Sequence, residues 1–239
     1  MKRIQQFHII LLVMITLTAC SSRHSSELPE NFHAISAMKN VMWKGQLGPV
    51  VSMDTLSGLE GVYGLGPESY LRGEILIDNG TTYVSRVKKN QSMEVIKTNA
   101  TSAPFFVYSQ VSRWDSLPLP NHIKTIPQLE QFIDSQTKRK IRPFAFKLEG
   151  EINSGIIHIQ NLPEGTKVSS PQEAHQGQVN YDLNSELVKI IGVFSTEHQG
   201  VFTHHDSFLH LHLITADFEK MGHLDAVEMS KMMLYLPEF

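Results

Sequence analysis

Three histidines near the end of the chain have the spacing of ligands to one metal ion. His210 and His212 are separated by one residue within the apolar run 208–214, FLHLHLI. On a β-strand successive side chains point to opposite faces, so both imidazoles lie on one face and the leucines between them face a core. Asp217 and Gly222 favour a chain reversal before His223. We therefore expect His223 to return beside the pair.

Neutral imidazoles are ligands that suit a divalent metal ion. Zinc fits best, because catalytic zinc sites keep three protein ligands and leave one position open for water or substrate. Imidazole also accepts manganese, nickel and iron, so the identity of the ion stays open. We interpret His198, His204 and His205 as ordinary surface or core residues.

The elements that must position these histidines are mostly β-strands. A hairpin is expected over 71–87, because apolar residues alternate on either side of an Asp-Asn-Gly turn at 78–80. Further strands are expected over 144–148, 156–159, 187–194 and 208–214, with a polar loop over 164–178.

One helix is predicted from its N-terminal signals. Thr125 is a suitable N-cap, Gln128 lies three residues on, and the basic run 138–140 ends the helix. Residues 113–122 are interrupted by two prolines and are the expected joint between subdomains. The chain is therefore predicted to be β-rich, with few helices.

The first 20 residues have the pattern of a bacterial lipoprotein signal peptide. Lys2 and Arg3 form a basic start, residues 8–17 are mostly apolar, and the sequence LTAC ends at Cys20, the only cysteine. Cleavage would make Cys20 the lipidated N-terminus and would leave no cysteine for a disulfide. The alternative is an uncleaved anchor with an ordinary Cys20.

The rest of the chain is interpreted as a tether followed by one globular domain. Residues 21–31 are polar and lack apolar periodicity, which indicates a flexible tether, and 32–239 form the domain. A formal net charge of −3 argues against a nucleic-acid surface. We expect an exported protein whose lipid anchor holds it at the cell envelope, on the periplasmic face of the outer membrane.

The histidine pattern is similar to that of the alpha-acetolactate decarboxylase family. The stretch from His210 through Gly222 and His223 resembles the family's H-x-H and downstream G-H, with the same separation between the second and third histidines. The segments GLG at 64–66 and LRGEI at 71–75 resemble its glycine-containing entry to an L-D-G-E strand. The LPE at 236–238 resembles its C-terminal L-P-E.

This resemblance implies a mixed, β-rich α/β fold, with a mixed β-sheet N-terminal subdomain and a β-rich C-terminal subdomain that has few helices. It further implies a zinc ion held by His210, His212 and His223, acidic partners at Glu74 and Glu238, and a homodimer. Without the resemblance, Glu74 would be interpreted as an exposed hairpin residue and Glu238 as part of a frayed terminus.

The reaction implied by the resemblance is the decarboxylation of 2-acetolactate, or of a related 2-hydroxy-3-oxo acid, to acetoin and CO2. A metal acting as a Lewis acid stabilises the negative charge that develops on the substrate's keto oxygen. Glu74 and Glu238 are expected to orient ligands or to transfer protons.

One segment departs from the family pattern. The family places an arginine on the strand after a segment that 144–150 resembles, whereas 156–160 contains His158 and Gln160 instead. Neither side chain offers the permanent planar fork with which arginine holds a carboxylate. Arg72 is the tentative substitute, and Arg142 is a weaker one.

Two alternatives therefore stay open. The first is a catalytically altered family member that binds a metal or a small ligand at the envelope. The second is another metal enzyme with an H-x-H strand, such as a cupin-type barrel, although the third histidine follows too soon for the usual cupin layout.

Overall fold

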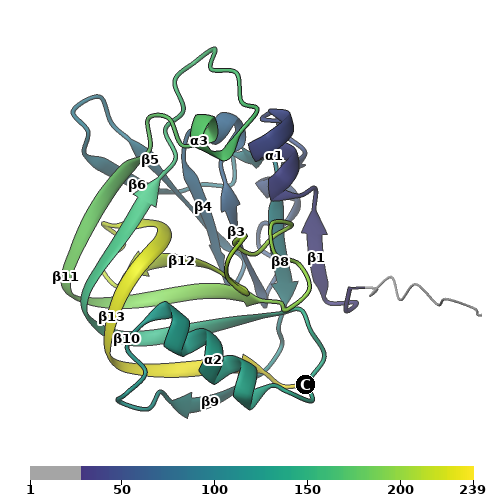
Figure 1. Ribbon diagram of the computed structural model, residues 1–239, viewed down its shortest axis with the longest axis vertical. Helices are drawn as coiled ribbons and strands as arrows, with labels where there is room; N and C mark the ends of the chain where they lie inside the picture. The colour runs from purple at the N-terminus through teal and green to yellow at the C-terminus, as the bar shows by residue number, and fades with distance from the viewer. Residues whose placement is uncertain (1–27) are drawn as a thin grey trace, which may run out of the picture.

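The computed structural model describes residues 28–239 (Figure 1). The expected signal peptide, Cys20 and most of the expected tether lie outside the described residues. Within this part of the chain, no helix has the length and apolar character needed to cross a membrane.

The N-terminal half of the domain forms a six-stranded sheet with the order β1-β8-β3-β4-β5-β6. Every neighbouring pair in it is antiparallel, so the expected mixed sheet is antiparallel in the described residues. The reason is that short connections, and not crossover helices, join each strand to the next from β3 through β6. The strands are β1 (Phe32–Ile35), β3 (Val62–Pro67), β4 (Glu74–Asp78), β5 (Thr81–Val87), β6 (Met93–Lys97) and β8 (Phe106–Gln110).

The predicted hairpin is confirmed as β4 and β5. Asn79 and Gly80 turn the chain with φ of 47° and 75°, the left-handed conformation that such tight hairpins need. The turn sets the register, in which Glu74 lies opposite Ser85 at the open end of the hairpin.

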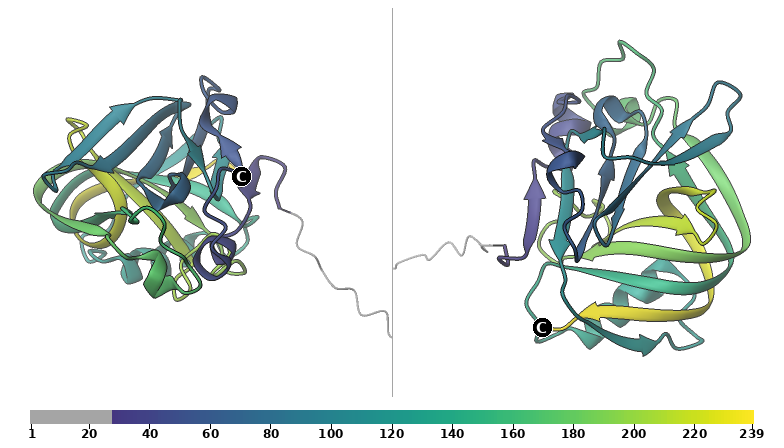
Figure 2. Two further views of the ribbon diagram at one scale, coloured as in Figure 1. Left: turned by 90° about the horizontal axis from the view of Figure 1, so that it is seen from above. Right: turned by 180° about the vertical axis from the view of Figure 1, so that it is seen from behind.

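The C-terminal half forms a second, strongly curved sheet (Figure 2). Its order is β10-β11-β12-β13-β9, and β10 also pairs with β13, so four strands close into a ring of antiparallel pairings. The strands are β9 (Trp114–Pro118), β10 (Phe144–Ile159), β11 (Val179–Phe194), β12 (Leu209–Thr215) and β13 (Met221–Pro237). A β-rich C-terminal unit was predicted, and its ring closure was not.

Three details differ from the predicted elements. The two strands expected over 144–148 and 156–159 are parts of the single strand β10, whose residues pair continuously with β11 apart from one gap at Asn153. The polar loop 164–178 contains the short helix α3 (Pro171–Ala174). The expected joint 113–122 lies where the chain leaves the first sheet, but half of it is β9, an edge strand that pairs with β13. Proline is tolerated on an edge strand, which explains why Pro118 does not break it.

Helices cover the sheets at few places. The predicted helix is confirmed as α2 (Ile126–Gln136), with both halves of the capping box between Thr125 and Gln128 present. The helix α1 (Met38–Lys44) follows β1 and ends at Gly45 in the left-handed conformation. The remaining elements are the 3-10 turns η1 (Met53–Thr55) and η2 (Ser69–Leu71) and the pair β2 (Val51–Ser52) and β7 (Ser102–Ala103).

Two hydrophobic clusters show which way each face of β12 points. Leu209, Leu211 and Leu213 belong to the cluster that packs the second sheet against α2. Ile214, on the other face, belongs to the cluster in which the two sheets pack together. Since side chains alternate along a strand, His210 and His212 face the six-stranded sheet.

Candidate metal centre

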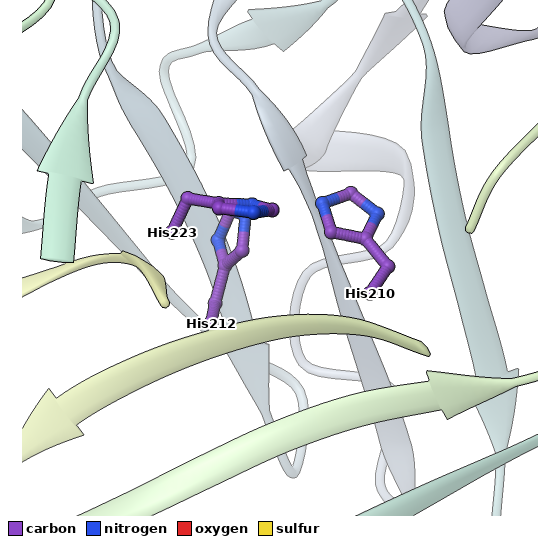
Figure 3. Close-up of side chains that lie close together, drawn as sticks. All are labelled: His210, His212 and His223. Atoms are coloured by element: carbon purple, nitrogen blue, oxygen red, sulfur yellow. The ribbon is translucent and has the colours of Figure 1, made fainter. Parts of the chain in front are cut away.

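The strand register brings the three predicted histidines together. His212 of β12 lies directly opposite His223 of β13, and His210 is two residues away on the same face. The ring centroids are 5.0 to 5.5 Å apart, and one ligand nitrogen from each residue lies within 4.8 Å of the other two (Figure 3). We call these three residues the buried centre.

The donor atoms of the buried centre fit a metal ion. His210 is 3 % exposed, His212 is fully buried, and neither ring nitrogen of His212 has a hydrogen-bond partner among the described residues. A buried polar atom without a partner costs about 1–3 kcal/mol, a cost that a ligand to that atom removes. Nδ1 of His210 lies 3.1 Å from the carbonyl oxygen of Phe202. An N–H donated there leaves Nε2 of His210 with its lone pair available to a metal.

The electrostatics of the centre keep its histidines in the ligating form. Burial lowers the pKa of His210 to about 3, and it lowers the pKa of His212 and of His223 well below the usual value. Neighbouring histidines act in the same direction, because a second positive charge nearby would repel the first. All three imidazoles are therefore neutral at neutral pH, as metal ligands must be.

Glu74 reaches the centre from the opposite sheet. It begins β4, is 2 % exposed, and holds Oε2 at 3.6 Å from Nε2 of His212. Its Oε1 accepts a hydrogen bond of 3.1 Å from the backbone N–H of Gln160. Burial raises the pKa of Glu74 well above its usual value, and the negative charge of Asp225 adds to the effect. The structure thus places this predicted carboxylate at the centre, and not on an exposed hairpin.

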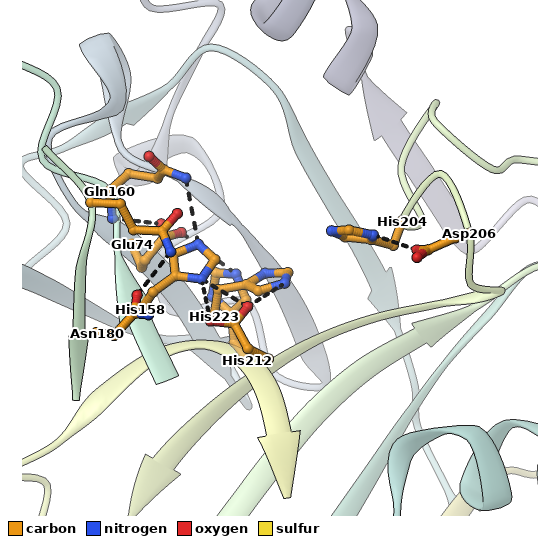
Figure 4. A network of polar contacts seen from close by, with 10 residues as sticks. Glu74, His158, Gln160, Asn180, His204, Asp206, His212 and His223 are labelled. Atoms are coloured by element: carbon orange, nitrogen blue, oxygen red, sulfur yellow. Dashed lines mark hydrogen bonds and ion pairs between the residues drawn. The ribbon is translucent and has the colours of Figure 1, made fainter. Parts of the chain in front are cut away.

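A second layer of polar side chains surrounds His223 (Figure 4). His158 lies opposite it on β10, with the two rings 4.7 Å apart. Nδ1 of His158 is 2.8 and 2.9 Å from the two carboxylate oxygens of Asp225. Nε2 of Gln160 lies 3.4 Å from Nε2 of His158, while Oε1 of Gln160 is buried and has no partner in the described part of the chain.

The sequence analysis did not identify Asp225 as a residue of the site, although its spacing from His223 could have indicated it. It follows His223 by two residues on β13, and residues two apart share one face of a strand. Its role could not be inferred without knowing that His158 of β10 lies beside the same face.

The structure does not bring Arg72 or Arg142 to the centre. Arg72 pairs with the exposed Glu164 at 3.4 Å, and Arg142 pairs with Asp134 at 2.7 Å beneath the Phe194 ring. Arg72 does not share a face with Glu74 because β4 begins only at Glu74, and the alternation of side chains along the strand does not extend back to Arg72. The displaced arginine expected in the sequence analysis is therefore not found here.

Glu238 is also remote from the three histidines within one chain. It follows the last residue of β13, whereas His223 is near the start of that strand of 17 residues. Its carboxylate forms an ion pair of 2.5 Å with Arg113, and its side chain is 45 % exposed. The C-terminal resemblance thus points to a residue at the other end of β13, because the extended strand separates its two ends.

A cavity of about 330 Å³ lies over the buried centre. One side of its lining is apolar, from Met38, Met42, Trp43, Pro67, Phe105 and Pro171. Lys39 of α1 is the one lysine or arginine among the described lining residues, and it makes no ion pair within residues 28–239. His204 and His205 also line the cavity, and both are at least partly exposed, as expected for surface residues.

Comparison with known proteins gives one family and one fold. The family model described as Alpha-acetolactate decarboxylase matches residues 33–239. The acetolactate decarboxylase of Bacillus subtilis subspecies spizizenii superposes with a TM-score of 0.72 at 18% identity, over 87% of this chain and 86% of that one. The alpha-acetolactate decarboxylase of Bacillus subtilis strain 168 gives 0.72 at 16%, over 87% and 86%.

A Staphylococcus aureus protein of unknown function, similar to alpha-acetolactate decarboxylase, gives a TM-score of 0.73 at 14% identity, over 87% of this chain and 85% of that one. No curated protein matches the sequence. At these identities the structural likeness shows a shared fold, and the family model shows the relationship.

Proposed function

The chain belongs to the alpha-acetolactate decarboxylase family, and from this premise we propose that it is a metal-dependent decarboxylase. Its proposed substrate is 2-acetolactate or a related 2-hydroxy-3-oxo acid, and its products are acetoin, or the matching hydroxyketone, and CO2. The observation that carries the proposal is the convergence of three neutral histidines beside a buried carboxylic acid, next to a cavity that His210, His223 and Glu74 line.

The buried centre is the proposed holder of the ion, with zinc as the first choice. His210, His212 and His223 supply three nitrogen donors, the set that leaves one position for substrate oxygens. A bound divalent ion supplies Lewis acidity, which favours negative charge on the keto oxygen next to the leaving carboxylate. The buried ring of His212 supports this assignment, because a metal ion would occupy one nitrogen that has no hydrogen-bond partner among the described residues.

Glu74 is the proposed proton-transferring group. Loss of CO2 leaves a carbon that must receive a proton, so the site needs an acid that still holds its proton near neutral pH. In the metal-free protein burial raises the pKa of Glu74 in that direction, and a bound divalent ion would act in the opposite direction. The N–H of Gln160 holds Oε1 of Glu74 in place and leaves Oε2 directed at the centre.

No arginine among the described residues lines the cavity, so another group must hold the substrate carboxylate. Lys39 supplies a cation at the rim of the cavity. The side-chain oxygen of Gln160 is buried and has no hydrogen-bond partner among the described residues, so it can accept a hydrogen bond from the substrate. We propose that Lys39 attracts the carboxylate and that Gln160, next to His158, contacts the substrate's polar groups. Met38, Met42 and Trp43 of α1 add an apolar lining to the same cavity.

The direct test is turnover with a measured metal content. The zinc-loaded full chain is given 2-acetolactate, and acetoin and CO2 are quantified; we expect both, and we expect loss of product and of zinc in the His210→Ala, His212→Ala double variant. His122→Ala, an exposed histidine, is the matched control. Unchanged zinc in the double variant would refute the centre.

A second candidate follows from the lack of an arginine among the described residues that line the cavity. It is a catalytically altered family member that binds a metal ion or a small hydroxy-keto ligand at the cell envelope. One zinc ion per chain without acetoin above background would favour this candidate over the decarboxylase.

We also propose that Cys20 is lipidated and anchors the protein at the cell envelope, and that the protein is a homodimer. The anchor rests on the LTAC pattern and the dimer on the family resemblance. Labelling with a fatty-acid analogue should mark the full chain and not its Cys20→Ala variant. Light scattering of the purified protein should give twice the mass of one chain.

A further inference from the structure

We propose that His204, His205 and Asp206 form a second, weaker divalent-cation site, from which the ion passes to the buried centre. One donor atom from each of the three lies within 4.8 Å of the other two. This outer site rests on the metal centre proposed above and does not depend on the reaction.

The chemistry of the outer site suits a borderline divalent ion such as zinc or cobalt. Two imidazoles and one carboxylate are a common donor set for these metals. Nδ1 of His204 lies 2.7 Å from Oδ1 of Asp206. This contact leaves Nε2 of His204 and Oδ2 of Asp206 as the donor atoms for an ion.

The outer site is open to solvent, in contrast to the buried centre. The side chain of His204 is 42% exposed and that of Asp206 is 69% exposed. Water would complete the coordination of an ion there. Ordering the loop around the ion would cost conformational entropy. We therefore expect binding at least about tenfold weaker than at the buried centre.

Its position lies on the route to the buried centre. The His204 ring is 6.0 Å from the His223 ring, and His204 lines the cavity together with His210 and His223. His204 also lines the two hollows on either side, one with Glu130 and one with His175. Figure 4 shows the His204 and Asp206 pair set apart from the His158 cluster.

This arrangement gives the outer site a use. His212 is fully buried, so an ion must lose its water shell before it reaches that residue. Divalent ions lose water more easily when protein donors replace the water molecules one by one. The outer site supplies the first three replacements within reach of His223.

The test is a calorimetric titration of the metal-free full chain with Zn²⁺ in the presence of a competing chelator. We expect two ions per chain in the wild type and in His122→Ala, and the tight ion alone in His204→Ala, His205→Ala. Asp206→Asn keeps the size of the side chain and should weaken the outer ion. A wild type that binds the tight ion alone, or two ions in the double variant, would overturn the outer site.

Transfer is tested by the rate at which the buried centre fills. Stopped-flow mixing with Co²⁺, followed by its visible absorption, should show loading slowed at least several-fold in His204→Ala, His205→Ala; equal rates would overturn the transfer role. The His210→Ala, His212→Ala variant should keep the weak ion and lose the tight one. A wild type that binds only the weak ion would contradict the buried centre and leave the outer site standing.

Discussion

Oε2 of Glu74, at the first position of β4, lies 3.6 Å from Nε2 of His212 in the middle of β12. This contact joins the two sheets at the buried centre, and neither residue is more than 2 % exposed. Burial moves the two pKa values in opposite directions, up for the acid and down for the imidazole, so both groups are neutral without a metal. A divalent ion beside them would favour the carboxylate.

Replacement of Glu74 by glutamine is expected to separate proton transfer from metal binding. Glu74→Gln keeps the size of the side chain and the bond from the Gln160 N–H, but it removes the transferable proton. We expect kcat to fall by about 100-fold or more, the usual range for loss of an acid-base group. The tightly bound zinc should stay at one ion per chain.

The measurement is steady-state acetoin formation together with metal analysis. Glu94→Gln, an exposed glutamate on β6, is the matched control and should retain full activity. Wild-type turnover in Glu74→Gln would exclude a role for this carboxylate in proton transfer.

The metal-free protein is expected to lose stability in acid because of its buried centre. His210 has an ordinary pKa of 6.5 when unfolded and a pKa of about 3 when folded. Between these values the unfolded chain binds more protons, so the free energy of unfolding falls as the pH is lowered from 6.5 toward 3. His212 and His223 act in the same direction.

Urea unfolding of the metal-free wild type at several pH values measures this effect. The His210→Ala, His212→Ala variant lacks two of the three groups, so its stability should change less over the same range; parallel curves would contradict the assignment. Glu74 has the opposite sign, because its raised pKa gives stability below pH 4.5 that is lost as the pH rises. Glu74→Gln should therefore gain stability relative to the wild type as the pH rises above 4.5.

Lys39 is expected to act on substrate binding and not on turnover. An exposed charge pair is worth about 1 kcal/mol or less, so Lys39→Ala should raise KM by about fivefold at most and leave kcat unchanged. The difference should shrink in high salt, since salt screens exposed charges.

Lys44→Ala is the matched control for this variant, because it removes an exposed lysine from the same helix that does not line the cavity. The two variants are compared by KM for 2-acetolactate at low and high ionic strength. An equal KM in both would show that Lys39 does not attract the substrate.

Gly222 is expected to control the position of His223. A Cβ at Gly222 would lie 2.4 Å from the carbonyl oxygen of His158, so alanine forces β13 away from β10. Gly222→Ala should cost about 1–3 kcal/mol of stability and should weaken zinc binding, because the next residue along is a ligand. Nothing lies within 4 Å of a Cβ at Gly48, which makes Gly48→Ala the control.

Urea unfolding and chelator competition measure the two effects of Gly222→Ala. A variant with reduced stability but unchanged zinc affinity would show that the centre adapts to movement of β13. Gly48→Ala should match the wild type in both measurements.

Local features of the sequence were sufficient to predict several elements. The alternation around His210 and His212, the Asn79 and Gly80 turn and the capping box at Thr125 each depend on residues that are neighbours along the chain. Their geometry follows from the periods of strands, turns and helices, so sequence spacing alone specified them.

The positions of the other site residues depended on how the two sheets pack and how their strands pair. The resemblance named both Glu74 and Glu238, but only Glu74 lies at the centre, whereas Glu238 lies at the far end of β13. Arg72 pairs with Glu164 and does not face the histidines. The pairing of His158 with Asp225 follows from the register between β10 and β13.

By itself, the sequence determined that His210 and His212 share a face and that a short turn precedes His223, because these relations are set within one hairpin. Only the tertiary structure decided that Glu74 closes the site and that no arginine among the described residues lines it. The physical reason is that these relations arise when two sheets pack face to face, and residues more than a hundred positions apart become neighbours through burial that local spacing does not encode.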